Sequence, residues 1–192
     1  IMNRARNTSS LNPTKFYGEV RGGSFVEVSD NDTLDFGTGA FTIEAWAKYD
    51  YKSTGSIFNV IMSLGGHSTS HATSAALMTH STPANGFYFY IAGASIGTYT
   101  PSPALVKGDW YHVVGTRAAD GTAKLYQDGV EKLSDAGNGG SITNAVEKYI
   151  GRDSLTSRHY KEAIDGVKIY NKALSLTEVQ RNYKATKGSH RN

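Results

Sequence analysis

Two acidic stretches of the sequence contain residue types that could do chemistry, and the first surrounds Asp165. The segment "EAIDGVKIY", residues 162–170, has the composition of a strand. Side chains alternate along a strand, so Asp165, Val167 and Ile169 are expected on one face. The two β-branched residues indicate that this face is buried, where a carboxylate is costly unless its charge is compensated. We therefore expect Asp165 to have a specific partner.

The second acidic stretch is "DNDTLD", residues 30–35, with three carboxylates and one asparagine in six residues. It does not follow the EF-hand pattern, because Asp35 stands at the sixth position, where that loop needs glycine, and no Glu stands at the twelfth. We expect a turn in which Asp and Asn side chains cap their own backbone. A second cation site is the alternative.

The sequence offers no convincing pair of carboxylates for cleaving a glycosidic bond. Glu44 is the only acidic residue of its expected strand, and the next side chains on its face are Trp46 and Lys48. A retaining hydrolase needs two carboxyls about 5 Å apart, and an inverting one needs them about 6.5–9.5 Å apart. The sequence also lacks a phosphate-binding glycine loop and any cysteine. We therefore expect a protein that is not an enzyme.

Aromatic side chains provide the candidate ligand-binding residues. In "GFYFYIAG", alternation puts Tyr88 and Tyr90 on the face opposite the phenylalanines. Sugar rings stack their C–H faces on aromatic rings, so an exposed row of tyrosines would suit a glycan. Tyr99 lies in a segment with loop composition and is a third candidate. The alternative is that Tyr88 and Tyr90 are packed inside the protein.

Length and composition allow one all-β domain with a large core. The chain has 192 residues, a formal net charge of +3 and no cysteine. The charge is too weak to indicate nucleic-acid binding, and no run approaches the roughly 18 apolar residues that cross a membrane. We expect neither a nucleic-acid partner nor membrane insertion. Residues 1–15 are polar and aperiodic, which predicts an N-terminal arm or linker before a single domain over residues 16–192.

Many short strands are predicted by segments in which apolar and polar residues alternate, or which are rich in aromatic and β-branched residues. These segments are residues 25–28, 41–49, 56–64, 86–93, 110–117, 122–127, 130–133, 148–153 and 162–170. Asp120-Gly121 and Asp128-Gly129 separate three of them, which favours an antiparallel meander with tight turns. Short strands with frequent turn signals indicate a sandwich or jelly roll.

One helix is expected near the end of the chain. Ser175 and Glu178 have the spacing of a capping box, and Leu176, Val179 and Tyr183 recur at helical intervals. The helical pattern ends near Gly188. The expected fold is therefore an all-β antiparallel sandwich with one short C-terminal helix.

Three stretches of the sequence resemble the laminin G-like, concanavalin A-like jelly-roll family. They are "SFVEVSDNDTLDFGTGAFTIEAWAKY", "GDWYHVVGTRAADGTAKLYQDGVEKL" and, at the end, "YIGRDS" followed by "EAIDGVKIYNKALSLTEVQRNY". The similarity covers roughly residues 20–185 and implies the jelly-roll fold.

The resemblance also implies a partner for Asp165. Related sandwiches often hold a structural calcium ion, with a carboxylate from the last strand and backbone carbonyls from an early glycine-containing strand. The matching early segment makes Gly22 or Gly23 the expected carbonyl donor. Ca²⁺ accepts about six to eight hard oxygen ligands, including backbone carbonyls. The alternative is that Asp165 only accepts hydrogen bonds from neighbouring backbone or from Lys168.

One fold hosts many functions, so the resemblance gives a function only as an expectation. It implies a non-catalytic glycan-binding or adhesion module of an extracellular or surface-displayed protein, with a glycan or a surface protein as partner. The alternative is a structural or decoration protein of a virion or cell-surface assembly. Residues 1–15 would then contact a neighbouring copy of the chain or another component.

Overall fold

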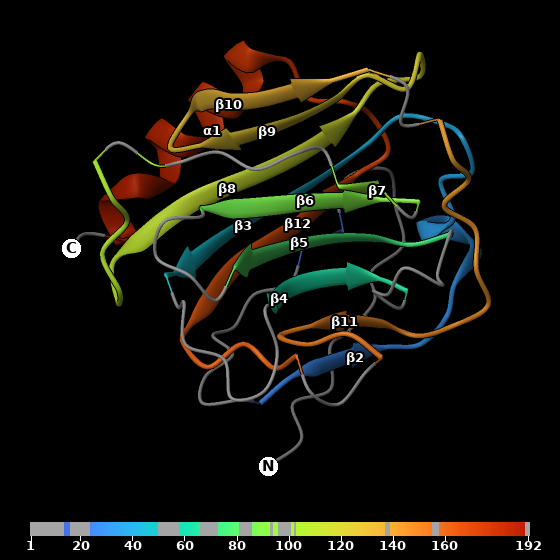
Figure 1. The fold of residues 1–192 in the computed structure, drawn as a ribbon, viewed down its shortest axis with the longest axis horizontal. Coiled ribbons are helices and arrows are strands. Elements are labelled where there is room, and N and C mark those ends of the chain that lie inside the picture. Colours follow the sequence, from blue (N-terminus) through green and yellow to red (C-terminus); the bar gives the residue numbers. More distant parts are fainter. Residues whose placement is uncertain are drawn as a thin grey trace.

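Two antiparallel β-sheets lie face to face in a computed structural model of the chain (Figure 1). The structure describes residues 14–15, 24–49, 58–65, 73–80, 86–92, 94–95, 101, 103–136, 139–154 and 158–190. The predicted all-β sandwich with a C-terminal helix is confirmed. Gly22, Gly23 and Tyr99 lie outside the described residues, as does most of the expected N-terminal arm.

The first sheet has the strand order β1-β12-β3-β8-β9-β10. Its strands are β1 (Thr14–Lys15), β12 (Ile164–Tyr170), β3 (Phe41–Lys48), β8 (Trp110–Arg117), β9 (Ala123–Gln127) and β10 (Val130–Asp135). Strands β8, β9 and β10 form the predicted meander. Thr14 and Lys15 pair with Ile169 and Lys168 of β12, so the end of the expected arm adds a short edge strand.

The second sheet has the strand order β2-β11-β4-β5-β6-β7. Its strands are β2 (Val26–Val28), β11 (Lys148–Ile150), β4 (Phe58–Leu64), β5 (Ala75–His80), β6 (Phe87–Ile91) and β7 (Ala94–Ser95). Every strand pair in both sheets is antiparallel. This arrangement brings chain segments far apart in sequence to the same end of the sandwich.

The main core fills the space between the two sheets. Alternation along β3 turns Phe41, Ile43, Ala45 and Ala47 inward, as the sequence predicts, and all four are fully buried. The sheets approach closely at Gly115, where an added Cβ would lie 2.5 Å from the ring of Phe89. A glycine is therefore needed there for the two sheets to pack at this spacing.

A β-bulge in β12 changes the expected orientation of Asp165. The pairing of β12 with β3 shifts register between Asp165 and Lys168, and Gly166 there has φ +58°. Ile164 and Val167 both point into the core, whereas Asp165 points to the opposite face. The prediction that Asp165 shares the buried face of Val167 and Ile169 is wrong. The reason is the extra residue of the bulge, which reverses the alternation.

The C-terminal helix α1 (Leu176–Thr186) lies on the outer face of the first sheet, beside β10 (Figure 1). Its predicted capping box is present, with Ser175 accepting from the Glu178 N–H and the Glu178 carboxylate accepting from the Ser175 N–H. Val179 packs with Val114 of the sheet. A 3₁₀ turn, η2 (Lys187–Ser189), ends the described chain. No helix among the described residues is long and apolar enough to cross a membrane.

Candidate functional site

Glu44 is the centre of a buried polar cluster between the first sheet and α1. Its carboxylate accepts hydrogen bonds from the Lys168 ammonium at 2.6 Å, the Tyr170 hydroxyl at 3.0 Å and the Asn182 amide at 2.7 Å. The side chain of Glu44 has no exposed surface. The carboxylate therefore has its charge compensated inside the protein and no path to a substrate.

The electrostatics of the cluster keep Glu44 ionised. Burial raises the pKa of this carboxyl, but contacts with His112 and Lys168 outweigh it and leave the pKa at about 2. His112 Nε2 lies 3.2 Å from a Glu44 oxygen without the alignment of a hydrogen bond, so we assign the larger effect to the Lys168 ammonium. Burial and the neighbouring carboxylate raise the pKa of Tyr170. Glu44 is thus a fixed anion rather than a proton donor.

The partner of Asp165 is a histidine near the end of the described chain. One carboxylate oxygen accepts from the Gly166 N–H at 2.7 Å, and the other lies 2.9 Å from His190 Nε2. The His190 ring stacks on Trp46 at 4.3 Å between centroids, and Trp110 packs edge-on against it. Asp165 therefore helps to hold the chain end against the sheet. Sequence reasoning missed His190 because 25 residues separate the two side chains.

The calcium expected at Asp165 stays a prediction. The carboxylate is partly exposed and could offer an oxygen, but a metal ion would have to displace or share the His190 contact. The expected carbonyl donors Gly22 and Gly23 lie outside the described residues. Among the residues that are described, no group of three or more His, Asp or Glu side chains is placed to hold a metal ion.

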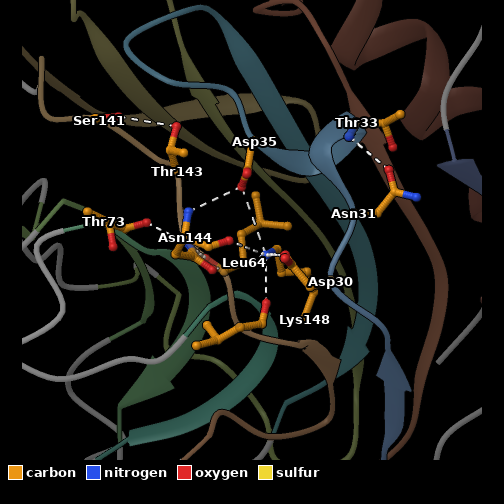
Figure 2. Close-up of polar contacts among 11 residues, drawn as sticks. Asp30, Asn31, Thr33, Asp35, Leu64, Thr73, Ser141, Thr143, Asn144 and Lys148 are labelled. Carbon is orange, nitrogen blue, oxygen red and sulfur yellow. Dashed lines mark hydrogen bonds and ion pairs between the residues drawn. The ribbon is translucent and has the colours of Figure 1, made fainter.

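A fully buried lysine binds the acidic loop at one end of the sandwich (Figure 2). The Lys148 ammonium donates to Asp30 Oδ1 and the Val146 carbonyl at 2.7 Å each, and to Asn144 Oδ1 and the Asn144 carbonyl at 3.0 and 3.2 Å. Asp35 lies 3.9 Å away. These oxygens are of the kind that bind metal cations, and here the cation they surround is an ammonium.

Asn144 connects three segments at the same end. Its amide donates to the carbonyls of Leu64 and Thr73, which flank the β4–β5 connection, and its backbone N–H lies 3.3 Å from Asp35 Oδ1 (Figure 2). An added Cβ on Gly65 would lie 2.7 Å from this amide, so the contact requires glycine. Together Lys148 and Asn144 fix the relative positions of these loops.

A second buried cation supports the neighbouring loops. Arg117 is fully buried, and its guanidinium donates to the carbonyls of Gly37, Gly39 and Gly140 at 2.5–3.0 Å. Burial lowers the pKa of Arg117 from its usual value. Backbone carbonyls thus replace the water that a guanidinium would otherwise bind.

The expected turn at "DNDTLD" is present, with an additional role. Asn31 Oδ1 accepts from the Thr33 N–H at 2.8 Å and caps the 3₁₀ turn η1 (Asp32–Leu34). The carboxylates of Asp30 and Asp35 contact Lys148 instead of capping the turn themselves. The lysine is distant in sequence, which is why local pattern reasoning did not find it.

The two tyrosines proposed as ligand contacts lie on the outer face of the second sheet. Tyr88 and Tyr90 point away from the phenylalanines of β6, as predicted, and pack with Val60, Ala76 and Met78. Each tyrosine is 6% exposed, so little of either ring is accessible to a sugar. Their ligand-binding role, like that of Tyr99, stays a prediction.

A small surface hollow lies between the segment before β8 and the β9–β10 turn. Its volume is about 200 Å³, and its lining residues are Pro101, Pro103, Ala104, Leu105, Tyr111, Gln127, Asp128 and Lys132. Sequence reasoning identified the Asp128-Gly129 turn but not the hollow, because residues 101 and 103–105 and the meander come together only in the fold. The hollow combines an aromatic ring, apolar walls, a carboxylate and an ammonium.

These features define a class of protein: a jelly-roll β-sandwich whose most deeply buried charges hold the sheet, the helix and the loops together. Residues 21–180 match the family model of the concanavalin A-like lectin/glucanases superfamily. The chain belongs to this superfamily, which confirms the resemblance of its sequence motifs. A search of curated proteins finds no relative of this chain.

Solved structures show the same fold at low sequence identity. The binding domain of Paraclostridial Mosquitocidal Protein 1 aligns with TM-score 0.65 and 15% identity, over 90% of this chain and 45% of that one. The botulinum neurotoxin serotype G binding domain aligns with TM-score 0.66 and 14% identity, over 92% of this chain and 47% of that one. The chain spans about half the length of these two domains.

A third similar structure is a domain of an enzyme. It is Domain 4 of AbnA, a GH43 extracellular arabinanase from Geobacillus stearothermophilus, in complex with arabinotriose. It aligns with TM-score 0.56 and 18% identity, over 84% of this chain and 74% of that one. Similarity at this level shows the shared fold.

Proposed function

We propose that this protein is a non-catalytic glycan-binding module that acts outside the cell. Family membership supports a binding module, and the similar structures include toxin binding domains and an arabinanase domain in complex with a trisaccharide. The observation that carries the proposal is the surface hollow beside Tyr111, because it joins apolar faces to hydrogen-bonding groups as sugar recognition requires.

The placement of carboxylates argues for binding rather than hydrolysis. Glu44 is sealed beneath α1 and holds an ammonium, and Asp165 contacts His190. Among the described residues that line the hollow, Asp128 is the single carboxylate, whereas glycoside hydrolysis ordinarily uses two. A glycan bound in the hollow would therefore dissociate without being cleaved.

The test is a glycan array with the labelled chain, followed by calorimetric titration of each glycan that binds. We expect saturable binding of a defined glycan class and no release of reducing sugar from it over a day. Absence of binding to every glycan would contradict the proposal. Release of sugar would show that the module is catalytic.

The structural calcium ion is proposed separately, on the resemblance and on the accessible Asp165 oxygen. It is tested by thermal unfolding in millimolar calcium and then in excess chelator. A ligand that binds only the native state raises the unfolding temperature, so chelation should lower the midpoint by several degrees. An unchanged midpoint, together with no metal in the purified protein, would contradict the proposal.

The assembly alternative depends on self-association. Light scattering of the purified chain over a range of concentrations tests it: stable oligomers would favour a structural or decoration role, and a monomer would favour the binding module. Thr14 and Lys15, at the end of the arm expected over residues 1–15, pair with this chain's own β12.

A further inference from the structure

We propose that the hollow beside Tyr111 is a subsite for one neutral sugar ring, with Lys132 and Asp128 as its hydrogen-bonding groups. This inference rests on the proposed glycan-binding function and names the ligand class for it. A left-handed turn places Asp128 at the hollow, and a β-bulge places Lys132 there. The fixed ring of Tyr111 forms one wall.

The β9–β10 turn fixes the carboxylate of Asp128. Asp128 has φ +53° and Gly129 has φ +78°, which is the left-handed geometry of a tight hairpin turn. Asp128 Oδ1 accepts from the His112 N–H at 2.9 Å, and Oδ2 accepts from the Gln127 amide at 3.1 Å. A carboxylate can accept about four hydrogen bonds, so Asp128 keeps capacity for sugar hydroxyls.

A β-bulge brings Lys132 to the hollow. The pairing of β10 with β9 shifts register between Glu131 and Leu133, so Lys132 is the extra residue. Such bulges redirect a side chain relative to its strand. Lys132 is partly buried and has no ion-pair partner among the described residues, whereas its neighbour Glu131 binds Lys124 at 2.9 Å. An ammonium held at a hollow without a carboxylate partner is available to a ligand.

The walls of the hollow are rigid and apolar. The Tyr111 hydroxyl accepts from the Val106 N–H at 2.9 Å, and its ring packs edge-on against Tyr49. Pro103 and Ala104 of the lining are exposed and add apolar surface. Apolar walls suit the C–H faces of a sugar ring, while the charged groups suit its hydroxyls.

Charge and size together specify the ligand. Lys132 only donates hydrogen bonds and the Asp128 carboxylate only accepts them, and their charges cancel. A hydroxyl does both, so a neutral polyhydroxylated ring satisfies both groups, whereas the carboxylate of an anionic sugar can accept from Lys132 but has no proton to donate to Asp128. A hollow of about 200 Å³ is smaller than the roughly 300–1,000 Å³ of pockets for drug-sized ligands, which limits it to one ring. We expect a dissociation constant on the order of 1 mM for a single sugar.

The experiment is a titration of the full isotope-labelled chain by NMR with glucose, galactose, arabinose and N-acetylglucosamine, and with glucuronate as the anionic comparison. We expect saturable shifts at Lys132, Gln127 and Asp128 with at least one neutral sugar. Lys132→Met should weaken this binding about tenfold or more, since a hydrogen bond from a charged group is lost. Ala104→Trp should abolish it by filling the hollow. Lys161→Met, at an exposed lysine outside the hollow, should bind like the original protein.

Each outcome decides one claim. If sugars bind but both hollow variants bind equally well, the hollow is not the site, while the proposed glycan-binding function stands. If glucuronate binds and the neutral sugars do not, the ligand class is wrong. If array glycans bind and no single sugar does, the one-ring subsite is wrong. If neither array glycans nor sugars bind, the proposed function itself fails.

Discussion

Replacing Lys148 by methionine should strongly destabilise the protein. The substitution keeps the length and apolar part of a side chain that has no exposed surface, but removes its ammonium. Asp30 Oδ1, Asn144 Oδ1 and the Val146 carbonyl then lose their shared donor. Removing one partner of a buried ion pair costs about 3–5 kcal/mol. The Asp30 side chain is 35% exposed and can be rehydrated, so we expect about 3 kcal/mol, the lower limit.

The assay is urea and thermal unfolding followed by circular dichroism. For a domain of this size, about 3 kcal/mol corresponds to a fall of roughly 6–12 °C in Tm. The matched control is Lys124→Met, because Lys124 forms an exposed pair with Glu131 at 2.9 Å and should contribute less than about 1 kcal/mol. Asp30→Asn combined with Lys148→Met should cost less than the sum of the two single changes. If Lys148→Met destabilised no more than Lys124→Met, the structural role of the buried ammonium would be refuted.

Two further predictions concern the first sheet. The pKa of Glu44 is lowered on folding from 4.5 to about 2, so the ionised carboxylate stabilises the folded protein by about 3 kcal/mol. This stabilisation is present above pH 4.5 and is lost as the pH falls through 2. The urea midpoint should therefore decline between pH 6 and pH 2, and Glu44→Gln should flatten this decline. Gly115→Ala should lower the free energy of unfolding in urea by about 1–3 kcal/mol, because the new methyl group would lie 2.5 Å from the Phe89 ring. An unchanged urea midpoint would contradict the close approach of the two sheets at Gly115.

Local pattern identified most strands, the turns and the helix, because alternation and capping are properties of adjacent residues. It missed β5, whose "AALMTH" sequence lacks β-branched residues apart from Thr79 and does not alternate in polarity. It also misplaced Asp165, since a bulge is decided by packing against β3 as much as by the glycine at position 166.

The candidate site was less predictable because its contacts join distant parts of the chain. Lys148 and Asp30 are 118 residues apart, and the hollow forms only where residues 101 and 103–105 meet the meander. A lysine in a strand such as "KYI" gives no local sign of being buried. The contacts of Lys148 and of the residues that line the hollow can be inferred only when the order of the strands in the sheets is known.

Sugar recognition by the hollow is tested most directly by binding of the intact chain to a glycan array, repeated with the Ala104→Trp variant. If the hollow is the sugar site, the chain should bind a defined set of glycans bearing neutral sugars and should lose that signal when the hollow is filled. A chain that binds no glycan under these conditions would contradict the proposed glycan-binding function.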